Sequence, residues 1–435
     1  MNKVGIISLG CAKNTVDSEV MLGTLKKKGY EITNKINEAD TIIINTCGFI
    51  DEARKESREA ILEVLPLKKE NKRIVITGCM SERYKNSLKY EFPDVDVFLG
   101  VNDVERIVDI LEKKQKPFSS TPYIYSEKSP RLLSTPKNWT YIKIAEGCSH
   151  SCSFCSIPSI KGDFRSRTID SIVREAEILA NRGIKEINLI SQDTTSYGRD
   201  LALKHGLLKL LKKLSNVKGI EWIRILYGYP DEVYDSLLDT LKEEKICPYL
   251  DIPVQHSEEK ILKKMGRGMD GKKILKFLEK VRKEVPDIVI RTSIIVGFPG
   301  EGENEFSNLI DFIKEARFDR LGVFTYSKEN GTKAEHLGDP IPKEEKMRRK
   351  NILLRLQKEI SLEKNATLLG KEMKILIEGT SDENPNYFIG RTKVQAPEVD
   401  GYFYARKNRF IKKDFLTAKV EKIGYHDLFG KIIGE

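Results

Sequence analysis

The sequence lacks three features that would each point to a particular class of protein. No run approaches the roughly 18 apolar residues that a membrane helix needs. No segment concentrates basic charge as nucleic-acid-binding proteins do, because the net charge of +10 is spread over 435 residues and residues 370–435 hold 12 basic and 10 acidic side chains. No secretory leader precedes the apolar residues 4–9. We therefore expect a cytoplasmic protein without membrane contact.

Cysteine is scarce, and its odd number argues against a framework of disulfides. In a long chain without a leader, thiols stay reduced, and cysteines at motif spacing indicate metal or redox chemistry instead. The seven cysteines are Cys11, Cys47, Cys79, Cys148, Cys152, Cys155 and Cys247. The remaining composition is that of folded proteins, with 40% hydrophobic residues and 30 glycines, and the length suits about three domains of roughly 150 residues.

One pattern occurs three times in residues 1–118. A run rich in β-branched apolar residues ends beside a neighbouring glycine and cysteine, and a polar, helix-compatible stretch follows. Short apolar strands that alternate with helices predict a parallel, doubly wound α/β domain. Cys11, Cys47 and Cys79 then lie at the carboxyl ends of their strands, the edge of a parallel sheet where ligands bind. We expect the three thiols to converge there, although each alone could be a small buried core residue.

A proline-rich linker is predicted at residues 119–133, and a second α/β domain at residues 134–366. In this domain, strand-like and helix-like segments alternate, which predicts a full or partial parallel βα barrel with its site at the carboxyl ends of the strands. The predicted strands are residues 141–145, 186–191, 222–227, 249–253, 289–296 and 320–325, and the clearest helices are residues 169–182 and 304–316.

The final part of the chain changes in character. A long amphipathic helix is predicted from Pro342 to Leu369, because apolar residues recur there near helical spacing. Beyond Lys371 the pattern becomes short strand-like segments separated by Gly, Asn-Pro and Asp-Gly turns. Residues 367–433 are therefore predicted to form a small antiparallel β-barrel.

The strongest local signal is the sequence Cys148-Ser-His-Ser-Cys152-Ser-Phe-Cys155, in which three thiols lie within eight residues. A structural zinc site needs four ligands, so zinc would have to recruit His150, which is wedged between two of the cysteines. A four-iron four-sulfur cluster held by three cysteines keeps one iron open for a substrate or cofactor. We favour the cluster and keep zinc as the alternative.

This spacing, followed by a βα barrel, closely resembles the radical S-adenosylmethionine (SAM) superfamily. The resemblance implies that the open iron binds the amino and carboxylate groups of SAM, and that an electron from the cluster cleaves SAM to a 5′-deoxyadenosyl radical, which requires a low-potential electron donor. No catalytic residue is expected beyond the cluster ligands. The residues expected to bind SAM are Phe154, Arg165, Gln192, Gln255, Arg291 and Gly297.

Ordinary structural roles remain open for several residues near these motifs. Gly297 lies in a Gly-Phe-Pro-Gly turn, and Arg165 and Arg167 could simply face solvent. His256 is a weaker candidate for binding the ribose of SAM than Gln255. Cys247 lies beside a predicted strand and is expected to be a core residue.

The triad of Cys11, Cys47 and Cys79, together with the radical SAM motifs and the final β-barrel, is similar to the methylthiotransferases over essentially the whole chain. The resemblance implies an auxiliary four-iron four-sulfur cluster on this triad and a carboxy-terminal TRAM domain, named for its occurrence in tRNA-modifying enzymes. Residues 152–162, 189–198 and 396–401 resemble the RimO type in particular. Ser191 departs from the alanine that is more common in the family.

The resemblance implies that the enzyme adds a methylthio group to the β-carbon of an aspartate in a ribosomal protein of the small subunit, number twelve. A MiaB-type enzyme, which modifies a tRNA adenosine, is the alternative with the same chemistry. A non-catalytic iron–sulfur or zinc scaffold is the alternative from another class. Glu398 and Asp400 are expected to bind the substrate, because acidic side chains complement a basic ribosomal protein better than they complement phosphates. RNA contact is expected only through the ribosome.

Overall fold

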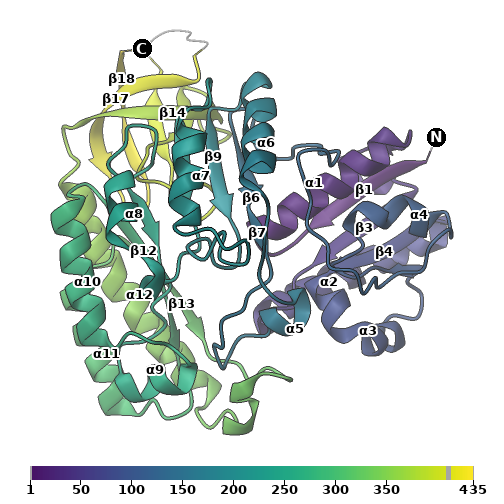
Figure 1. Cartoon of the computed structure of the whole chain (residues 1–435), viewed down its shortest axis with the longest axis horizontal. Helices are drawn as coiled ribbons and strands as arrows, with labels where there is room; N and C mark the ends of the chain where they lie inside the picture. Colours follow the sequence, from purple (N-terminus) through teal and green to yellow (C-terminus); the bar gives the residue numbers. More distant parts are fainter. Residues whose placement is uncertain (1, 408–412, 435) are drawn as a thin grey trace.

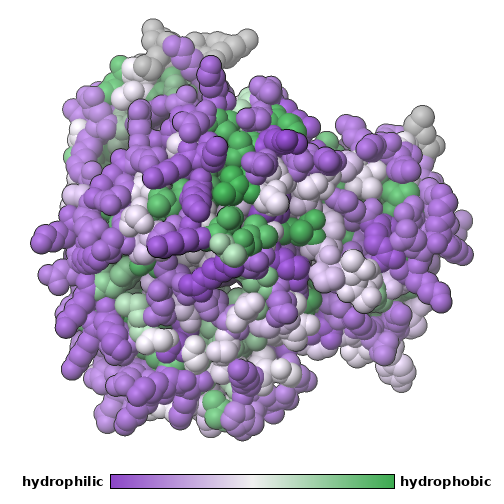
Figure 2. All heavy atoms as spheres, viewed as in Figure 1, coloured by the Kyte–Doolittle hydropathy of each residue, from purple (hydrophilic) through white to green (hydrophobic). Residues whose placement is uncertain are grey.

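The computed structural model describes residues 2–407 and 413–434, which form three bodies in chain order (Figure 1). An amino-terminal parallel sheet is followed by a partial βα barrel, and a closed β-barrel ends the chain. The expected α/β architecture is confirmed. No helix among the described residues is long and apolar enough to cross a membrane. Figure 2 shows the same face of the molecule covered mainly by hydrophilic residues.

The amino-terminal sheet is parallel throughout and has the strand order β2-β1-β3-β4-β5. Its strands are β1 (Lys3–Ser8), β2 (Glu31–Ile32), β3 (Thr41–Thr46), β4 (Arg73–Gly78) and β5 (Val97–Phe98), and its helices are α1 (Ala12–Lys27), α2 (Asp51–Val64), α3 (Cys79–Glu91) and α4 (Ile107–Leu111). Ile43 and Val75 pack against α1 and α4, whereas Ile42 and Ile74 pack against α2 and α3 on the other face. Apolar side chains therefore point to both faces, as a doubly wound sheet requires.

The central body contains two three-stranded parallel sheets, β6-β9-β10 and β11-β12-β13, joined by a parallel bridge between Ile223 and Ile246. The strands are β6 (Trp139–Lys143), β9 (Glu186–Ile190), β10 (Trp222–Ile225), β11 (Tyr249–Asp251), β12 (Val289–Val296) and β13 (Arg320–Thr325). The helices outside them are α6 (Ile169–Asn181), α7 (Gly206–Ser215), α8 (Asp235–Thr240), α9 (Glu259–Met265), α10 (Gly271–Glu284) and α11 (Glu303–Ala316). Because β6 and β13 are both edges, the barrel is partial.

A long helix leads from the barrel to the carboxy-terminal body, as predicted. Helix α12 (Lys343–Ala366) packs beside β13, and a closed barrel of order β14-β15-β16-β18-β17 follows. Its strands are β14 (Glu372–Thr380), β15 (Tyr387–Arg391), β16 (Phe403–Arg406), β17 (Phe415–Ile423) and β18 (Leu428–Gly434). One pair, β16 with β18, is parallel, because β17 runs back along β14 before β18 closes the barrel.

The two flanking bodies cover opposite ends of the partial barrel. The amino-terminal body contacts the carboxyl ends of the strands: Lys143, the last residue of β6, pairs with Asp17 of α1, and Thr325, the last residue of β13, donates a hydrogen bond to Glu52 of α2 (3.2 Å). The carboxy-terminal barrel contacts the amino ends, where the first residue of β10, Trp222, meets the Phe415 ring. Ligands of parallel sheets bind at the carboxyl ends, so the site is expected where the first two bodies meet.

The segment between α4 and β6 has no helix or strand, yet side chains hold it against both bodies. Arg131 donates to Glu19 of α1 (2.6 Å) and to Glu175 of α6 (2.8 Å), and Tyr125 also donates to Glu175 (3.0 Å). All four side chains are buried or nearly so. The segment predicted as a linker therefore acts as a strap that joins the amino-terminal body to the barrel.

Candidate functional site

The amino-terminal cysteine triad lies at one edge of the first sheet. Cys11 precedes α1, Cys47 follows β3, and Cys79 begins α3 after β4. Asn14 links the three positions, because its amide donates to the carbonyls of Leu9 (2.8 Å) and Thr46 (3.2 Å) and its oxygen lies 4.0 Å from the Cys79 sulfur. A Cβ on Gly10 would lie only 2.8 Å from the Cβ of Cys47. The loop that carries Cys11 therefore needs glycine to approach Cys47 this closely.

The second triad, Cys148, Cys152 and Cys155, lies in the loop between β7 (Ala145–Glu146) and α5 (Ile157–Lys161). Helix α9 and the turn after it hold this loop from one side: the backbone N–H of Ser153 donates to the carbonyl of Met265 (2.9 Å). The Arg267 guanidinium lies 3.7 Å from the sulfur of Cys152. The loop is therefore fixed to the barrel, with its thiols at the carboxyl ends of the strands.

The structure argues against zinc in this loop. His150, the one available fourth ligand, is hydrogen-bonded to Asp193 (2.5 Å) and stacks on the Tyr229 ring at 4.0 Å. Within residues 2–407 and 413–434, no three His, Cys, Asp or Glu side chains, those of the two triads included, are already grouped as a metal site. Three thiols without a free fourth ligand suit an open-site iron–sulfur cluster better than a structural zinc site.

The ligand thiols are mostly buried, and this burial favours their protonated form. Burial raises the pKa of Cys47 to about 11 and that of Cys79 to about 12 in the first triad, and it raises the pKa of Cys155 to about 12 in the second. Without metal these three thiols are therefore neutral near pH 7. Metal ligation requires thiolates, so assembling the clusters must release protons.

A buried network of charges joins the two triads. The Lys143 ammonium pairs with Asp17 of α1 and with Glu146 (2.5 Å) beside the second cysteine loop, and Lys161 of α5 pairs with the same two carboxylates (3.2 and 3.5 Å). All four side chains are at most 7% exposed. Burial alone would raise the pKa of Glu146, but the two lysines hold it well below its usual range. Two positive and two negative charges therefore link the helix after Cys11 to the loop of Cys148.

Of three further predicted SAM-binding residues, one contacts this network directly. The Gln192 amide donates to Glu146, while its oxygen is buried without a partner. Gln255 follows β11 with φ near +71°, and its backbone N–H donates to Ser293 of β12 (2.9 Å). Phe154 is half-buried beside the apolar group that includes Phe298. The unpaired oxygen of Gln192 fits a ligand that donates a hydrogen bond, such as a ribose hydroxyl.

Two further predicted residues have a clear structural use. Gly297 has φ of +78°, and a Cβ there would lie 2.4 Å from the Lys346 side chain of α12. The close packing of α12 therefore favours glycine at this position, and the SAM contact of Gly297 stays a prediction. Arg165 donates to the carbonyls of Asp163 (2.7 Å) and Lys161 (3.0 Å). It closes its own loop, and its buried Nε has no partner.

Two assignments must be corrected, because the residues lie at the amino end of the barrel. Arg291, only the third residue of β12, donates to the Val399 carbonyl (3.1 Å) and pairs with Asp400 (3.3 Å). The Asp400 side chain is fully buried and accepts a hydrogen bond from Tyr249 (2.7 Å). Both side chains join the final barrel to the partial barrel, so neither a SAM contact by Arg291 nor a substrate contact by Asp400 fits. Glu398 accepts from Tyr141 (2.7 Å) but its residue is exposed, so its substrate role stays a prediction.

Three other residues that the sequence singled out are structural. His256 is fully buried, 3.2 Å from Glu301, and Arg167 is buried against Glu175. Cys247 is 0% exposed within a hydrophobic cluster, which confirms it as a core residue.

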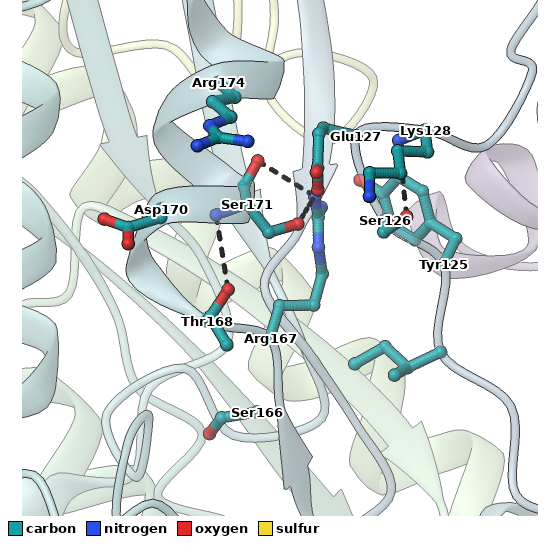
Figure 3. Close-up of a pocket in the computed structure, with 11 residues that line it drawn as sticks. Tyr125, Ser126, Glu127, Lys128, Ser166, Arg167, Thr168, Asp170, Ser171 and Arg174 are labelled. Atoms are coloured by element: carbon teal, nitrogen blue, oxygen red, sulfur yellow. Dashed lines mark hydrogen bonds between the residues drawn. The ribbon is translucent and has the colours of Figure 1, made fainter.

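A cavity of about 400 Å³ lies elsewhere, at the start of α6 (Figure 3). Thr168, Ser171 and Arg174 line it, and Figure 3 shows the Arg167 guanidinium directed at Ser171. None of the seven cysteines lines this cavity, so it is separate from the thiol chemistry.

Sequence reasoning missed two ring–cation pairs near the triads. The ammonium of Lys13 lies 3.3 Å from the centre of the Tyr227 ring, and the Arg267 guanidinium lies 3.8 Å from that of Tyr229. Each pair joins residues more than 30 positions apart in the chain. The position of Lys13 two residues after Cys11 was the only signal available.

Three family models match the chain. Residues 3–100 match the uncharacterized protein family UPF0004, residues 142–313 match the radical SAM superfamily, and residues 369–433 match the TRAM domain. Among solved structures, the radical SAM methyltransferase TsrM from Kitasatospora setae, with cobalamin and a [4Fe-4S] cluster bound, has a TM-score of 0.55 and 15% identity, and the alignment covers 77% of each chain. At this identity the likeness supports the fold alone.

Curated relatives match over nearly the full length. A protein of Thermoanaerobacter sp. (strain X514), named ribosomal protein uS12 methylthiotransferase RimO, is 46% identical over 99% of this chain and 100% of its own. A protein of the same name from Aquifex aeolicus is 47% identical over 99% of this chain and 97% of its own. With both cysteine triads in place, the chain belongs to the RimO methylthiotransferase family of the radical SAM superfamily.

Proposed function

We propose that this chain transfers a methylthio group to the β-carbon of an aspartate in ribosomal protein uS12. The observation that carries the proposal is the placement of two separate cysteine triads, each with three thiols, on the two bodies that meet at the carboxyl ends of the barrel strands. Relatives named as uS12 methylthiotransferases support the choice of substrate. The aspartate itself comes from the resemblance to the family.

The cofactors of the family are two four-iron four-sulfur clusters and SAM, and the residues present fit them. Cys148, Cys152 and Cys155 would hold the cluster that cleaves SAM, and Cys11, Cys47 and Cys79 would hold the auxiliary cluster. When bound, these groups supply a 5′-deoxyadenosyl radical that abstracts hydrogen and the sulfur that is transferred. A radical is needed because the β C–H bond of aspartate is not acidic enough for a side-chain base.

The protein's own contribution is to fix the two triads relative to each other and to bind the ligands. The buried network of Asp17, Lys143, Glu146 and Lys161 joins α1 to the second cysteine loop. Holding reacting groups close together can lower an activation barrier by several kcal/mol. A rigid link between the triads keeps them at a fixed separation. The unpaired, buried amide oxygen of Gln192 supports its assignment to a hydroxyl of SAM.

The competing functions are less well supported. A tRNA adenosine methylthiotransferase shares the chemistry, but the relatives reported above are named for uS12. A non-catalytic scaffold does not agree with membership of an enzyme family. The TRAM domain is compatible with RNA contact on the ribosome, and a low-potential electron donor must supply the reducing electron.

Mass spectrometry tests the proposal directly. The anaerobically reconstituted enzyme, reduced with dithionite, is incubated with SAM and with uS12, assembled small subunits or unmodified tRNA. The expected result is the mass of one methylthio group on an aspartate of uS12, free or in the subunit, and none on tRNA. Modification of tRNA with unmodified uS12 would overturn the proposal in favour of the MiaB-type reaction.

A further inference from the structure

Lys13 is the cation nearest in sequence to the amino-terminal triad, and its ammonium lies over an aromatic ring. The Nζ atom is 3.3 Å from the ring centre of Tyr227, which follows β10. Tyr227 is itself fixed: its N–H donates to Asp251 (3.0 Å) and its carbonyl accepts from Thr194 (2.8 Å). The ring therefore holds the ammonium between α1 and the carboxyl end of the barrel.

This ammonium has no acidic partner among the described residues. Within residues 2–407 and 413–434, no hydrogen bond or ion pair involves its Nζ. The nearby acids are already engaged: Glu146 pairs with Lys143, and Asp251 accepts from Tyr227 and lies 3.6 Å from Arg291. By contrast, the lysines at 143 and 161 each pair with two carboxylates. Among the described residues, Lys13 is therefore a cation without an ion pair of its own.

Lys13 is half-buried, and its neighbours in the helix are more deeply buried. Its residue is partly exposed, whereas Ala12 and Asn14 on either side are buried. Because Cys11 lies two residues away, a group bound to this ammonium would lie beside the amino-terminal triad. A ligand that carries a carboxylate next to its reacting carbon would satisfy the charge and place that carbon at the site.

We propose that Lys13 binds the side-chain carboxylate of the substrate aspartate, and that Tyr227 positions the ammonium for it. This inference rests on the proposed function and extends it to the residue that selects aspartate. The β-carbon is bonded directly to the carboxylate carbon, so a salt bridge at Lys13 fixes the reacting carbon within one bond of the recognised group. An asparagine has the same shape without the charge and leaves Lys13 unpaired.

The test compares two peptides of the uS12 sequence, one with the target aspartate and one with asparagine at that position. Binding is measured by fluorescence anisotropy for the holoenzyme and for Lys13→Met, Lys13→Arg and Lys26→Met variants. Lys26 is an exposed lysine of the same helix and serves as the matched control. Iron content and SAM cleavage are measured for each variant.

For the unmodified enzyme, we expect the aspartate peptide to bind about 10–100-fold more tightly than the asparagine peptide, as for other partly buried charge pairs. Lys13→Met should remove this preference by weakening the aspartate peptide alone, Lys13→Arg should retain most of it, and Lys26→Met should change nothing. SAM cleavage should survive in Lys13→Met.

Other outcomes overturn the inference. If the unmodified enzyme binds both peptides equally, the inference is wrong. This comparison needs no variant, so it holds even where Lys13→Met fails to fold or to hold iron. An unchanged preference in a folded, iron-loaded Lys13→Met also overturns the inference. Weaker SAM binding with unchanged peptide binding would assign Lys13 to the carboxylate of SAM instead. Failure of the proposed function is distinct, because the unmodified enzyme would then bind the aspartate peptide without forming a methylthio product.

Discussion

The two ends of the partial barrel are both closed by another body of the chain, yet they differ in how their charges are satisfied. At the amino end, Arg391 pairs with Glu186 (2.6 Å) and Glu378, and Asp400 pairs with Arg291. At the carboxyl end, a neutral network of four charges also seals the interface, but among the described residues the Lys13 ammonium forms no ion pair. Charged groups left without a partner are typical of functional sites, whereas fully paired charges are typical of structural contacts.

The largest expected effect separates the triads from the seventh cysteine. Cys47→Ala and Cys152→Ala should each lower the iron content of the anaerobically purified chain from about eight to about four atoms, because each removes one cluster. Cys247→Ala, in the core, should keep about eight and only lower stability. Equal iron content in Cys47→Ala and Cys247→Ala would contradict the assignment of the first triad.

The next effect concerns the network at the carboxyl end. Asp17→Asn leaves two buried lysines with one carboxylate, and removing one partner of a buried pair costs about 3–5 kcal/mol. The variant should unfold at lower urea concentration and should lose methylthiolation far more than SAM cleavage, because the triads are no longer held together. Glu38→Gln, in an exposed pair with Lys35, is the control and should cost at most about 1 kcal/mol. Parallel losses of both activities would indicate a general folding defect instead.

Arg391→Met makes the matching change at the amino end. It leaves Glu186 with Arg224 alone and Glu378 unpaired, so a stability loss of about 3–5 kcal/mol is again expected in urea denaturation. Here, however, iron content and SAM cleavage by the folded fraction should stay near those of the unmodified enzyme. Loss of SAM cleavage without loss of stability would contradict the claim that the amino end of the barrel is structural and the carboxyl end functional.

The smallest effect is expected for Glu398→Gln. The amide oxygen can still accept the hydrogen bond from Tyr141, and surface changes usually stay within about 0.5 kcal/mol. The KM for uS12 should therefore stay unchanged if Glu398 only docks the final barrel. A several-fold rise in KM with unchanged stability would instead confirm the substrate contact predicted from the sequence.

Much of this arrangement could be predicted from local pattern. The β-branched runs ending near Cys11, Cys47 and Cys79 identify three parallel strands, and parallel strands bring their carboxyl ends to one edge. The strands at Val289–Val296 and Arg320–Thr325 have the predicted bounds. Motif spacing and strand periodicity depend only on residues that are neighbours in the sequence, so they can be predicted without knowing the tertiary contacts.

What could not be predicted depends on contacts between distant segments. Asp400 reads as an exposed acid in a loop, but folding buries it against Arg291 and Tyr249, which lie more than 100 residues earlier. A Cβ on Gly297 would clash with Lys346 of α12, almost 50 residues later in the chain. The pairing of Lys13 with Tyr227 joins two bodies of the chain. Each depends on contacts between segments far apart in the chain, which no local pattern encodes.

The central claim is that the two triads divide the labour at the carboxyl end. The most direct measurement follows 5′-deoxyadenosine and modified uS12 peptide together for the reconstituted Cys47→Ala variant. The predicted result is that reduced enzyme still forms 5′-deoxyadenosine from SAM, while no methylthio product appears. Methylthiolation by Cys47→Ala, or loss of SAM cleavage in a variant that keeps the second cluster, would contradict it.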